Sequence, residues 1–240
     1  MERILILYDN RSDKEALRPG WGFSALIERG GKTVLFDVGA DVLVLKQNAK
    51  ACGVDLKATD ALVLSHEHCD HIGAISAALH RSQDVFYPAS FSSQFENEIW
   101  DDGRNPLWTK RPVTDPVEVA PGIHSTGEIK GKNEIVEQGV IVETSEGTIL
   151  ITGCAHPGVV RMVEQATDIN NRCPYLVLGG FHLLRKKDSE VQAIAAQLKQ
   201  LGVKRIGPCH CTGERAATVL RDAFSGASVE VSTGTEIAIR

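Results

Sequence analysis

The 240-residue chain lacks a long apolar run, and this absence excludes several classes of protein. No stretch approaches the roughly 20 apolar residues that span a membrane, and the first one, residues 4–8, is too short for a signal peptide. The net charge is only −5, so the chain also lacks the basic excess of a general nucleic-acid or anionic-membrane binder. We therefore expect a cytoplasmic protein that has no nucleic-acid and no membrane partner.

The chain also lacks the cysteine patterns of a disulfide scaffold. Its six cysteines show no regular spacing and no Cys-x-x-Cys pair. The run Cys209-His210-Cys211 does not have the spacing of a structural zinc knuckle. Cysteines that lie inside histidine-containing segments are expected to remain free thiols in a reducing compartment.

No Pro-, Gly- or Ser-rich linker divides the chain. A hydrophobic content of 42% and a charged content of 24% are ordinary for a globular protein. The length is sufficient for one large α/β domain with a buried core. We predict a single domain over residues 1–240, and no coiled-coil pattern indicates an oligomeric state.

Strand and helix patterns alternate along the chain. Apolar runs flank two short turns and predict hairpins around residues 29–32 and 144–147. Other strands are predicted over residues 61–64, 85–87, 175–178, 205–208, 229–231 and 237–239. Helices are predicted over residues 42–51, 72–79, 159–166, 190–200 and 214–224. Both halves combine a hairpin, a strand and a helix, which suits two sheets covered by helices.

Residues 88–121 lack this periodicity and carry prolines, tryptophans and alternating charges. We predict an irregular insertion there that could act as a flap over the substrate. Its Trp100 and Trp108 could stack on a planar heterocycle or simply anchor the loop. Trp108 is therefore a candidate substrate-binding residue, and Trp21 and Phe23 are candidates for the mouth of the same pocket.

The segment 65–71 concentrates three of the eight histidines of the chain. Alternate side chains of an extended segment point the same way, so His66 and His68 can bind one ion. Asp70 and His71 follow at the turn into the next helix, where they could hold a second ion, and Asp70 could also cap that helix. Imidazole and carboxylate suit zinc, iron or manganese, and paired ions activate water or bind a substrate oxygen.

Two later histidines follow predicted strands. His156 lies on a turn from which it could reach the ion held by His66 and His68, or bond the backbone instead. His182 comes after two glycines and close to Arg185. It could face the substrate and stabilise a developing negative charge, or it could be a core histidine. We take His182 and Arg185 as candidate substrate-binding residues, and Asp70 and His182 as candidate catalytic residues.

The run His-x-His-x-Asp-His between a strand and a helix resembles the signature of the metallo-β-lactamase fold superfamily. Residues 21–24, 35–39, 152–158, 179–182 and 208–213 resemble one of its subgroups, the 7,8-dihydropterin-6-methyl-4-(β-D-ribofuranosyl)aminobenzene 5'-phosphate synthase-like proteins. The resemblance implies an α/β fold of the αββα sandwich type, with two mixed β-sheets flanked by helices. It also implies that His210 binds the second ion beside Asp70 and His71.

Cys154 departs from the pattern of many superfamily members, which have a metal-bridging aspartate at this position. Its thiolate could bridge two ions, or it could be a buried thiol beside them. The departure argues against a standard β-lactamase activity. Asp37, at the end of its strand, is expected to orient the histidine segment by hydrogen bonding rather than to bind metal.

The resemblance implies an enzyme that carries two divalent transition-metal ions, zinc by preference and iron or manganese otherwise. We favour a metallohydrolase that acts on a small phosphorylated or ester substrate through metal-activated water. One alternative is a transferase of the pterin synthase type, with a pterin and a phosphorylated aminobenzene as substrates. A non-catalytic sensor of metal or ligand is the other.

Overall fold

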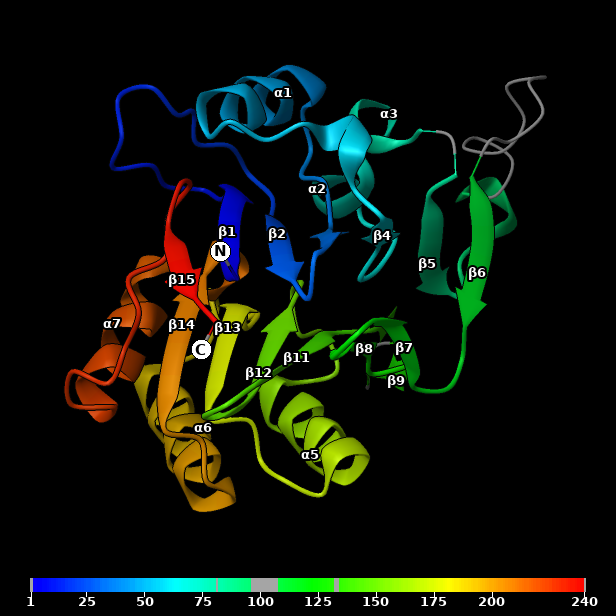
Figure 1. Cartoon of the computed structure of the whole chain (residues 1–240). Coiled ribbons are helices and arrows are strands. Elements are labelled where there is room, and N and C mark those ends of the chain that lie inside the picture. The colour runs from blue at the N-terminus through cyan, green and yellow to red at the C-terminus, as the bar shows by residue number, and fades with distance from the viewer. Residues whose placement is uncertain (1, 81, 96–107, 132–133, 240) are drawn as a thin grey trace.

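The structure, a computed structural model of the whole chain, describes residues 2–80, 82–95, 108–131 and 134–239, and Trp100 lies outside them. Two sheets pack face to face, and each is covered on its outer face by helices (Figure 1). Both sheets contain parallel and antiparallel neighbours. The expected α/β sandwich with two mixed sheets is confirmed. No helix in the described part of the chain has the length and apolar character needed to cross a membrane.

The first sheet has the strand order β15-β1-β2-β3-β4-β5-β6. Its strands are β1 (Arg3–Tyr8), β2 (Ser24–Arg29), β3 (Lys32–Phe36), β4 (Ala61–Val63), β5 (Asp84–Pro88), β6 (Thr109–Val113) and β15 (Glu236–Ala238). Strands β3 to β6 are parallel. The turn between β2 and β3 consists of Gly30 and Gly31, whose φ values of 58° and 73° suit a tight hairpin.

The second sheet has the order β14-β13-β12-β11-β8-β7. Its strands are β7 (Val117–Ala120), β8 (Ile123–Ser125), β11 (Val140–Thr144), β12 (Gly147–Thr152), β13 (Leu176–Gly180) and β14 (Arg205–Cys209). The predicted hairpin joins β11 to β12, while β12, β13 and β14 are parallel. A separate pair is formed by β9 (Ile129–Lys130) and β10 (Val136–Glu137).

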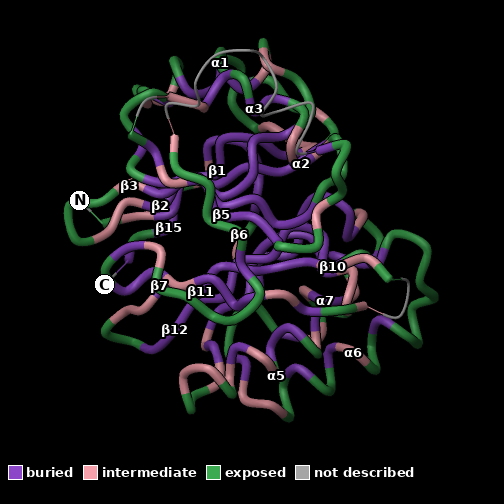
Figure 2. The backbone as a smooth tube through the Cα atoms, turned by 90° about the vertical axis from the view of Figure 1, so that its right-hand side faces the viewer, coloured by how far each residue is buried: buried purple, intermediate pink, exposed green. Residues whose placement is uncertain are grey.

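The helices form two layers around the sheets. The first sheet is covered by α1 (Val42–Ala51), η1 (Leu56–Ala58), α2 (Cys69–Ile72) and α3 (Ile75–Ala78). The second is covered by α5 (Val159–Asn170), α6 (Asp188–Leu201) and α7 (Glu214–Ala223), and η2 (His210–Thr212) follows β14. Strand β1 shows how alternation builds these layers, because Ile4 and Ile6 pack between the sheets while Leu5 and Leu7 pack under the helices. Figure 2 shows the buried residues concentrated in the strands.

The helix expected over residues 72–79 is broken into α2 and α3. The Ala74 N–H donates to the carbonyl of Gly39, 3.1 Å away, instead of continuing the helix. The carbonyl of Asp70 accepts from the Phe23 N–H, 3.3 Å away. Two distant segments therefore take the hydrogen bonds that a continuous helix would have made.

Residues 88–121 are less irregular than expected, because β6 and β7 lie within them. Strand β6 lies at the edge of its sheet, and all of its residues except Val113 are exposed. A polar edge strand shows no apolar alternation, which is why the sequence pattern does not reveal it. The expected strand over residues 229–231 is replaced by one hydrogen bond from the Val229 N–H to the carbonyl of Ile206, 2.7 Å away, and a bridge at Ser228.

Candidate metal centre

The segments that carry the predicted ligands begin where parallel strands end. His66 follows β4, Cys154 follows β12, His182 follows β13 and His210 follows β14. The carboxyl ends of parallel strands lie at one edge of a sheet, where ligands commonly bind. Strand β4 belongs to the first sheet and β12 to β14 belong to the second, so the packing of the two sheets brings these ends together and gathers side chains as far apart in the sequence as His66 and His210.

His66, His68 and His156 form a first histidine group. Their ring centroids are 4.6 to 4.8 Å apart. His66 Nε2 lies 3.1 Å from His68 Nδ1, and ring nitrogens of His66 and His156 lie within 4.8 Å of Cys154 Sγ. The structure thus brings together the three imidazoles predicted to share one ion.

Asp70, His71, His210 and Cys154 form a second ligand group, with ligand atoms within 4.8 Å of one another. Asp70 Oδ2 is 3.3 Å from His210 Nε2, and His71 Nε2 is 3.2 Å from Cys154 Sγ. Cys154 therefore lies between the two groups, at the place where a bridging thiolate would have to lie.

The donor atoms have the properties that a metal site requires. His156 Nε2 and His210 Nε2 are buried, and neither has a hydrogen-bond partner within the described ranges. Burial lowers the pKa of His66, and the neighbouring His71 lowers it further. Burial also lowers the pKa of His156 to about 3. The lowered pKa values keep His66 and His156 neutral, and buried nitrogens without a partner are available to bind a metal, so this donor set fits divalent transition-metal ions.

Asp37 orients one histidine in each group, as expected for a residue at the end of β3. Its buried carboxylate accepts from the Ser65 N–H and Ser65 Oγ, both at 2.7 Å, and from His71 Nδ1 at 2.6 Å. Because the Ser65 hydroxyl uses its proton in the hydrogen bond to Asp37, its oxygen accepts a hydrogen bond from His66 Nδ1, 2.8 Å away. Burial would lower the pKa of His71, but the Asp37 carboxylate raises it overall. The Nε2 atoms of His66 and His71 are therefore left to face the centre.

Glu137 holds the turn that carries Cys154 and His156, and sequence reasoning missed it. Its carboxylate accepts from the backbone N–H groups of Cys154, Ala155 and His156 at 2.8 to 2.9 Å. Burial raises the pKa of Glu137 to about 7, although these N–H groups oppose the shift. No sequence motif marks Glu137, because its partners are backbone N–H groups on the turn after β12 and not side chains of a recognisable type.

Asn10 was also missed, and it orients His210. Asn10 Oδ1 accepts from His210 Nδ1, 3.0 Å away, which leaves Nε2 facing Asp70. Asp9 Oδ2 accepts from the backbone N–H of His210 at 3.0 Å. The polar Asp9-Asn10 pair directly after the first strand is a signal that could have indicated this role.

Four non-glycine residues around the centre have a left-handed backbone. Asp37, Ala155, His182 and His210 have φ values between 48° and 57°. Each such conformation costs on the order of 1 kcal/mol or more, and it persists only where the surrounding structure imposes it. The fold therefore holds the site segments in conformations that the isolated chain would avoid.

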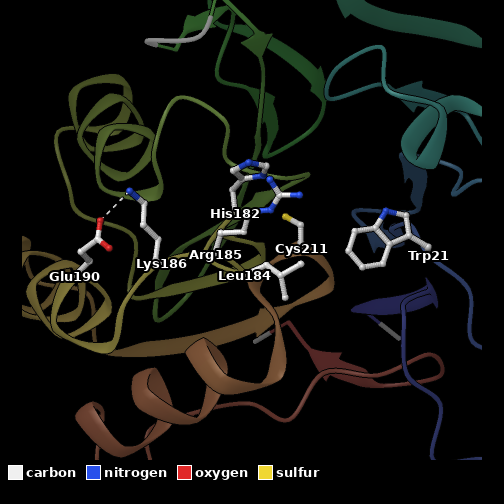
Figure 3. Close-up of a pocket in the computed structure, with 7 residues that line it drawn as sticks. All are labelled: Trp21, His182, Leu184, Arg185, Lys186, Glu190 and Cys211. Atoms are coloured by element: carbon white, nitrogen blue, oxygen red, sulfur yellow. Dashed lines mark hydrogen bonds and ion pairs between the residues drawn. The ribbon is translucent and has the colours of Figure 1, made fainter.

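A cavity of about 560 Å³ opens beside the centre (Figure 3). It is lined by Trp21, His182, Leu184, Arg185, Lys186, Glu190 and Cys211. Lys186 pairs with Glu190 at 3.1 Å, whereas Arg185 has no partner within the described ranges and lies beside the His182 ring. Trp21 and Leu184 are 53% and 55% exposed, so they offer an apolar face. The cavity therefore combines a free cation with an aromatic surface.

His182 connects this cavity to the first histidine group, since its ring centroid lies 4.4 Å from that of His156. Trp108 is not brought together with His182 and Arg185. It packs against the hydrophobic cluster that includes Tyr87. Trp108 precedes β6, which is parallel to β5, so it lies at the amino ends of the strands, opposite the centre. Trp21 is the tryptophan that lines the cavity.

Substituting Cys154 by serine is expected to weaken binding of the second ion by at least about tenfold, because the thiolate is a stronger ligand than a hydroxyl. Cys154→Asp should restore occupancy, since a carboxylate bridges well. Elemental analysis measures the metal content, and circular dichroism checks the fold. Cys173→Ser, a partly buried thiol outside the ligand groups, is the control. Unchanged metal content in Cys154→Ser would make Cys154 a packed thiol only.

Comparison with known proteins identifies relatives with the same architecture. The family model described as the metallo-beta-lactamase superfamily matches residues 17–210. The 7,8-dihydropterin-6-methyl-4-(beta-D-ribofuranosyl)-aminobenzene-5'-phosphate synthase of Methanocaldococcus jannaschii is 29% identical, over 85% of this chain and 84% of its own. The crystal structure of a metal-dependent hydrolase of the beta-lactamase superfamily is 27% identical with a TM-score of 0.79, covering 100% of this chain and 99% of that chain. The short form of human tRNase Z shares the fold alone, at 12% identity and a TM-score of 0.67 over 99% of each chain.

Proposed function

From the premise that this chain belongs to the metallo-beta-lactamase superfamily, we propose that it is a metallohydrolase acting on a small phosphorylated substrate. The observation that carries the proposal is that the two ligand groups meet at Cys154 next to a cavity that contains an unpaired Arg185. A cation that no side chain neutralises is suited to bind an anionic substrate group.

The first histidine group would hold one ion and the second ligand group the other, and Cys154 is close enough to contribute its thiolate to either. Zinc is the ion we propose, and iron or manganese would suit the same ligands. When bound, such a pair activates water and neutralises the charge that develops on the reacting group. The relatives that carry functional names are enzymes, so a non-catalytic sensor is not supported.

Four residues of the chain bind and orient the substrate and the attacking water. Burial would raise the pKa of Asp70, but the close approach of His210 Nε2, 3.3 Å away, and the nearby His71 lower it overall. Asp70 is therefore ionised, and its carboxylate would accept a hydrogen bond that orients the attacking water. His182 donates to an oxygen of the substrate, and Arg185 binds its anionic group. Trp21 covers the apolar part of the substrate.

A transferase of the pterin synthase type is the second proposal. It is favoured by the 29% identical relative and by a cavity of about 560 Å³ that joins an indole surface to a free guanidinium. A pterin is a planar heterocycle, and its stacking on Trp21 together with phosphate binding at Arg185 would use both features. In that reaction the ions held by the same ligand groups would neutralise the charge of a diphosphate leaving group on the pterin substrate.

A substrate panel separates the two reactions. Metal-replete protein is assayed with phosphoesters and a neutral lactone, and pterin binding is measured by titration calorimetry. Arg185→Ala should raise KM for phosphoesters by about tenfold, the value of one charge-assisted hydrogen bond, and leave the lactone unaffected. Lys50→Ala, an exposed cation on α1, is the matched control.

For the transferase, Trp21→Ala and His182→Ala should weaken pterin binding without loss of metal. Trp108→Ala should do so less than Trp21→Ala, because only Trp21 lines the cavity. Rapid turnover of phosphoesters with no pterin binding would leave the hydrolase and remove the transferase. Turnover of neither class of ester, together with tight pterin binding, would reverse that choice.

A further inference from the structure

Cys211 and His182 belong to a third cluster of ligand atoms, which the two ligand groups above do not explain. The thiols of Cys154 and Cys211 and a ring nitrogen of His182 lie within 4.8 Å of one another. We propose that these three side chains form a separate cation site at the rim of the cavity, which binds a thiophilic ion of the zinc and cadmium class.

The fold places the three side chains on adjacent strands. Cys154, His182 and Cys211 follow β12, β13 and β14, which are parallel neighbours. The Cys211 carbonyl accepts from the Leu184 N–H at 3.3 Å, which ties η2 to the loop after β13. A Cβ at Gly180 would lie 2.6 Å from Cys211 Sγ, so glycine is required for this close approach. The cluster is therefore a built arrangement rather than a chance meeting of surface residues.

The three side chains supply the ligand types that such an ion prefers. Two thiolates and one imidazole are a known ligand set for zinc with one open coordination position. Thiolates also favour soft cations over magnesium or calcium. The Cys211 thiol donates to the backbone carbonyl of Cys154, 3.5 Å away, and the ligand atoms of the three side chains lie within 4.8 Å of one another, so the groups already converge. His182 and Cys211 line the cavity, so the open position of the ion would face it.

The third site shares the Cys154 thiol with the second ligand group. A thiolate bridges two ions, so when the third site is filled Cys154 would connect its ion to the second ion in place of the ion of the first histidine group. Occupancy of the two sites would then be coupled, whereas the ion held by His66, His68 and His156 would be affected less. The inference does not rest on the proposed reaction, because it concerns metal binding alone.

Cadmium is the probe for the test. Protein stripped of metal is titrated with Cd²⁺, and both the bound ions and the thiolate-to-cadmium absorption are measured. Cys211→Ser keeps the size of the side chain and should bind one ion fewer than wild type, with about half of the absorption, because one of two thiolate ligands is lost. Cys173→Ser, a thiol outside the ligand groups, should match wild type.

A variant of the second ligand group and a spectrum of the wild-type protein complete the test. His210→Ala removes a ligand of the second group, and it should weaken cadmium binding at the third site through the shared Cys154 without removing the absorption that depends on Cys211. The variant thereby distinguishes loss of ion binding at the second ligand group from loss of ion binding at the third site. Cadmium NMR of wild-type protein should show an ion bound by two sulfurs, which requires no variant to fold. Equal cadmium content and absorption in wild type and folded Cys211→Ser, or no such NMR signal, would overturn the proposal.

Discussion

Removal of metal with a strong chelator is expected to lower turnover by about a thousandfold or more, and added zinc should restore it. The physical reason is that bound ions supply several kcal/mol of charge stabilisation in the transition state. The protein should remain folded, because the two sheets are held by large clusters of buried apolar side chains, while the ligands lie in the segments after the strands. Turnover and metal content are followed together during stripping and refilling.

Single substitutions assign the ions to their ligands. His66→Ala should lose the ion of the first histidine group, and His210→Ala should lose the second, each with a large fall in turnover. His80→Ala is the matched control, because His80 Nε2 contacts the Thr59 carbonyl at 2.7 Å and lies outside the ligand groups. Wild-type protein that is consistently free of metal and fully active in chelator would contradict the proposal of a metal-dependent enzyme.

Asp37→Asn is expected to weaken binding of both ions by about 10- to 100-fold, the usual effect of losing a group that orients metal ligands. The carboxylate orients His71 directly and His66 through Ser65, so one substitution acts on both groups. The free energy of unfolding should fall by about 1–3 kcal/mol, because a buried network is left partly unsatisfied. Metal titrations and denaturant unfolding of the metal-free protein measure the two effects.

The matched control for this prediction is Asp60→Asn. Asp60 also accepts from a backbone N–H of a neighbouring segment, that of Thr33 at 2.8 Å, and pairs with Lys32. This pair is solvent-exposed, so its loss should cost less than about 1 kcal/mol and leave metal binding unchanged. Equal losses of stability in the two variants, with metal affinity intact in Asp37→Asn, would reduce Asp37 to an ordinary structural carboxylate.

Local spacing in the chain was enough to place the ligand segments. His66, His68, Asp70 and His71 are neighbours, so their common location needs no knowledge of the fold, and the turn glycines Gly30 and Gly31 likewise mark their own hairpin. The alternation of strand and helix patterns was also sufficient for the α/β class with two covered sheets. These features are encoded within a few residues, where periodicity and turn chemistry act directly.

Contacts between distant segments determined the features of the site that local spacing could not show. Glu137 and Asn10 have no motif, because they act on backbone or ring atoms of residues 17 to 200 positions away. The choice of Trp21 over Trp108 at the cavity follows from strand direction, since β6 begins at the edge opposite the centre. The meeting of Cys154 and Cys211 depends on three parallel strands and on the absence of a side chain at Gly180. Burial also lowers the pKa of His66 and His156 and leaves His156 Nε2 and His210 Nε2 without a hydrogen-bond partner among the described residues, a property that belongs to the packed molecule and not to the order of its residues.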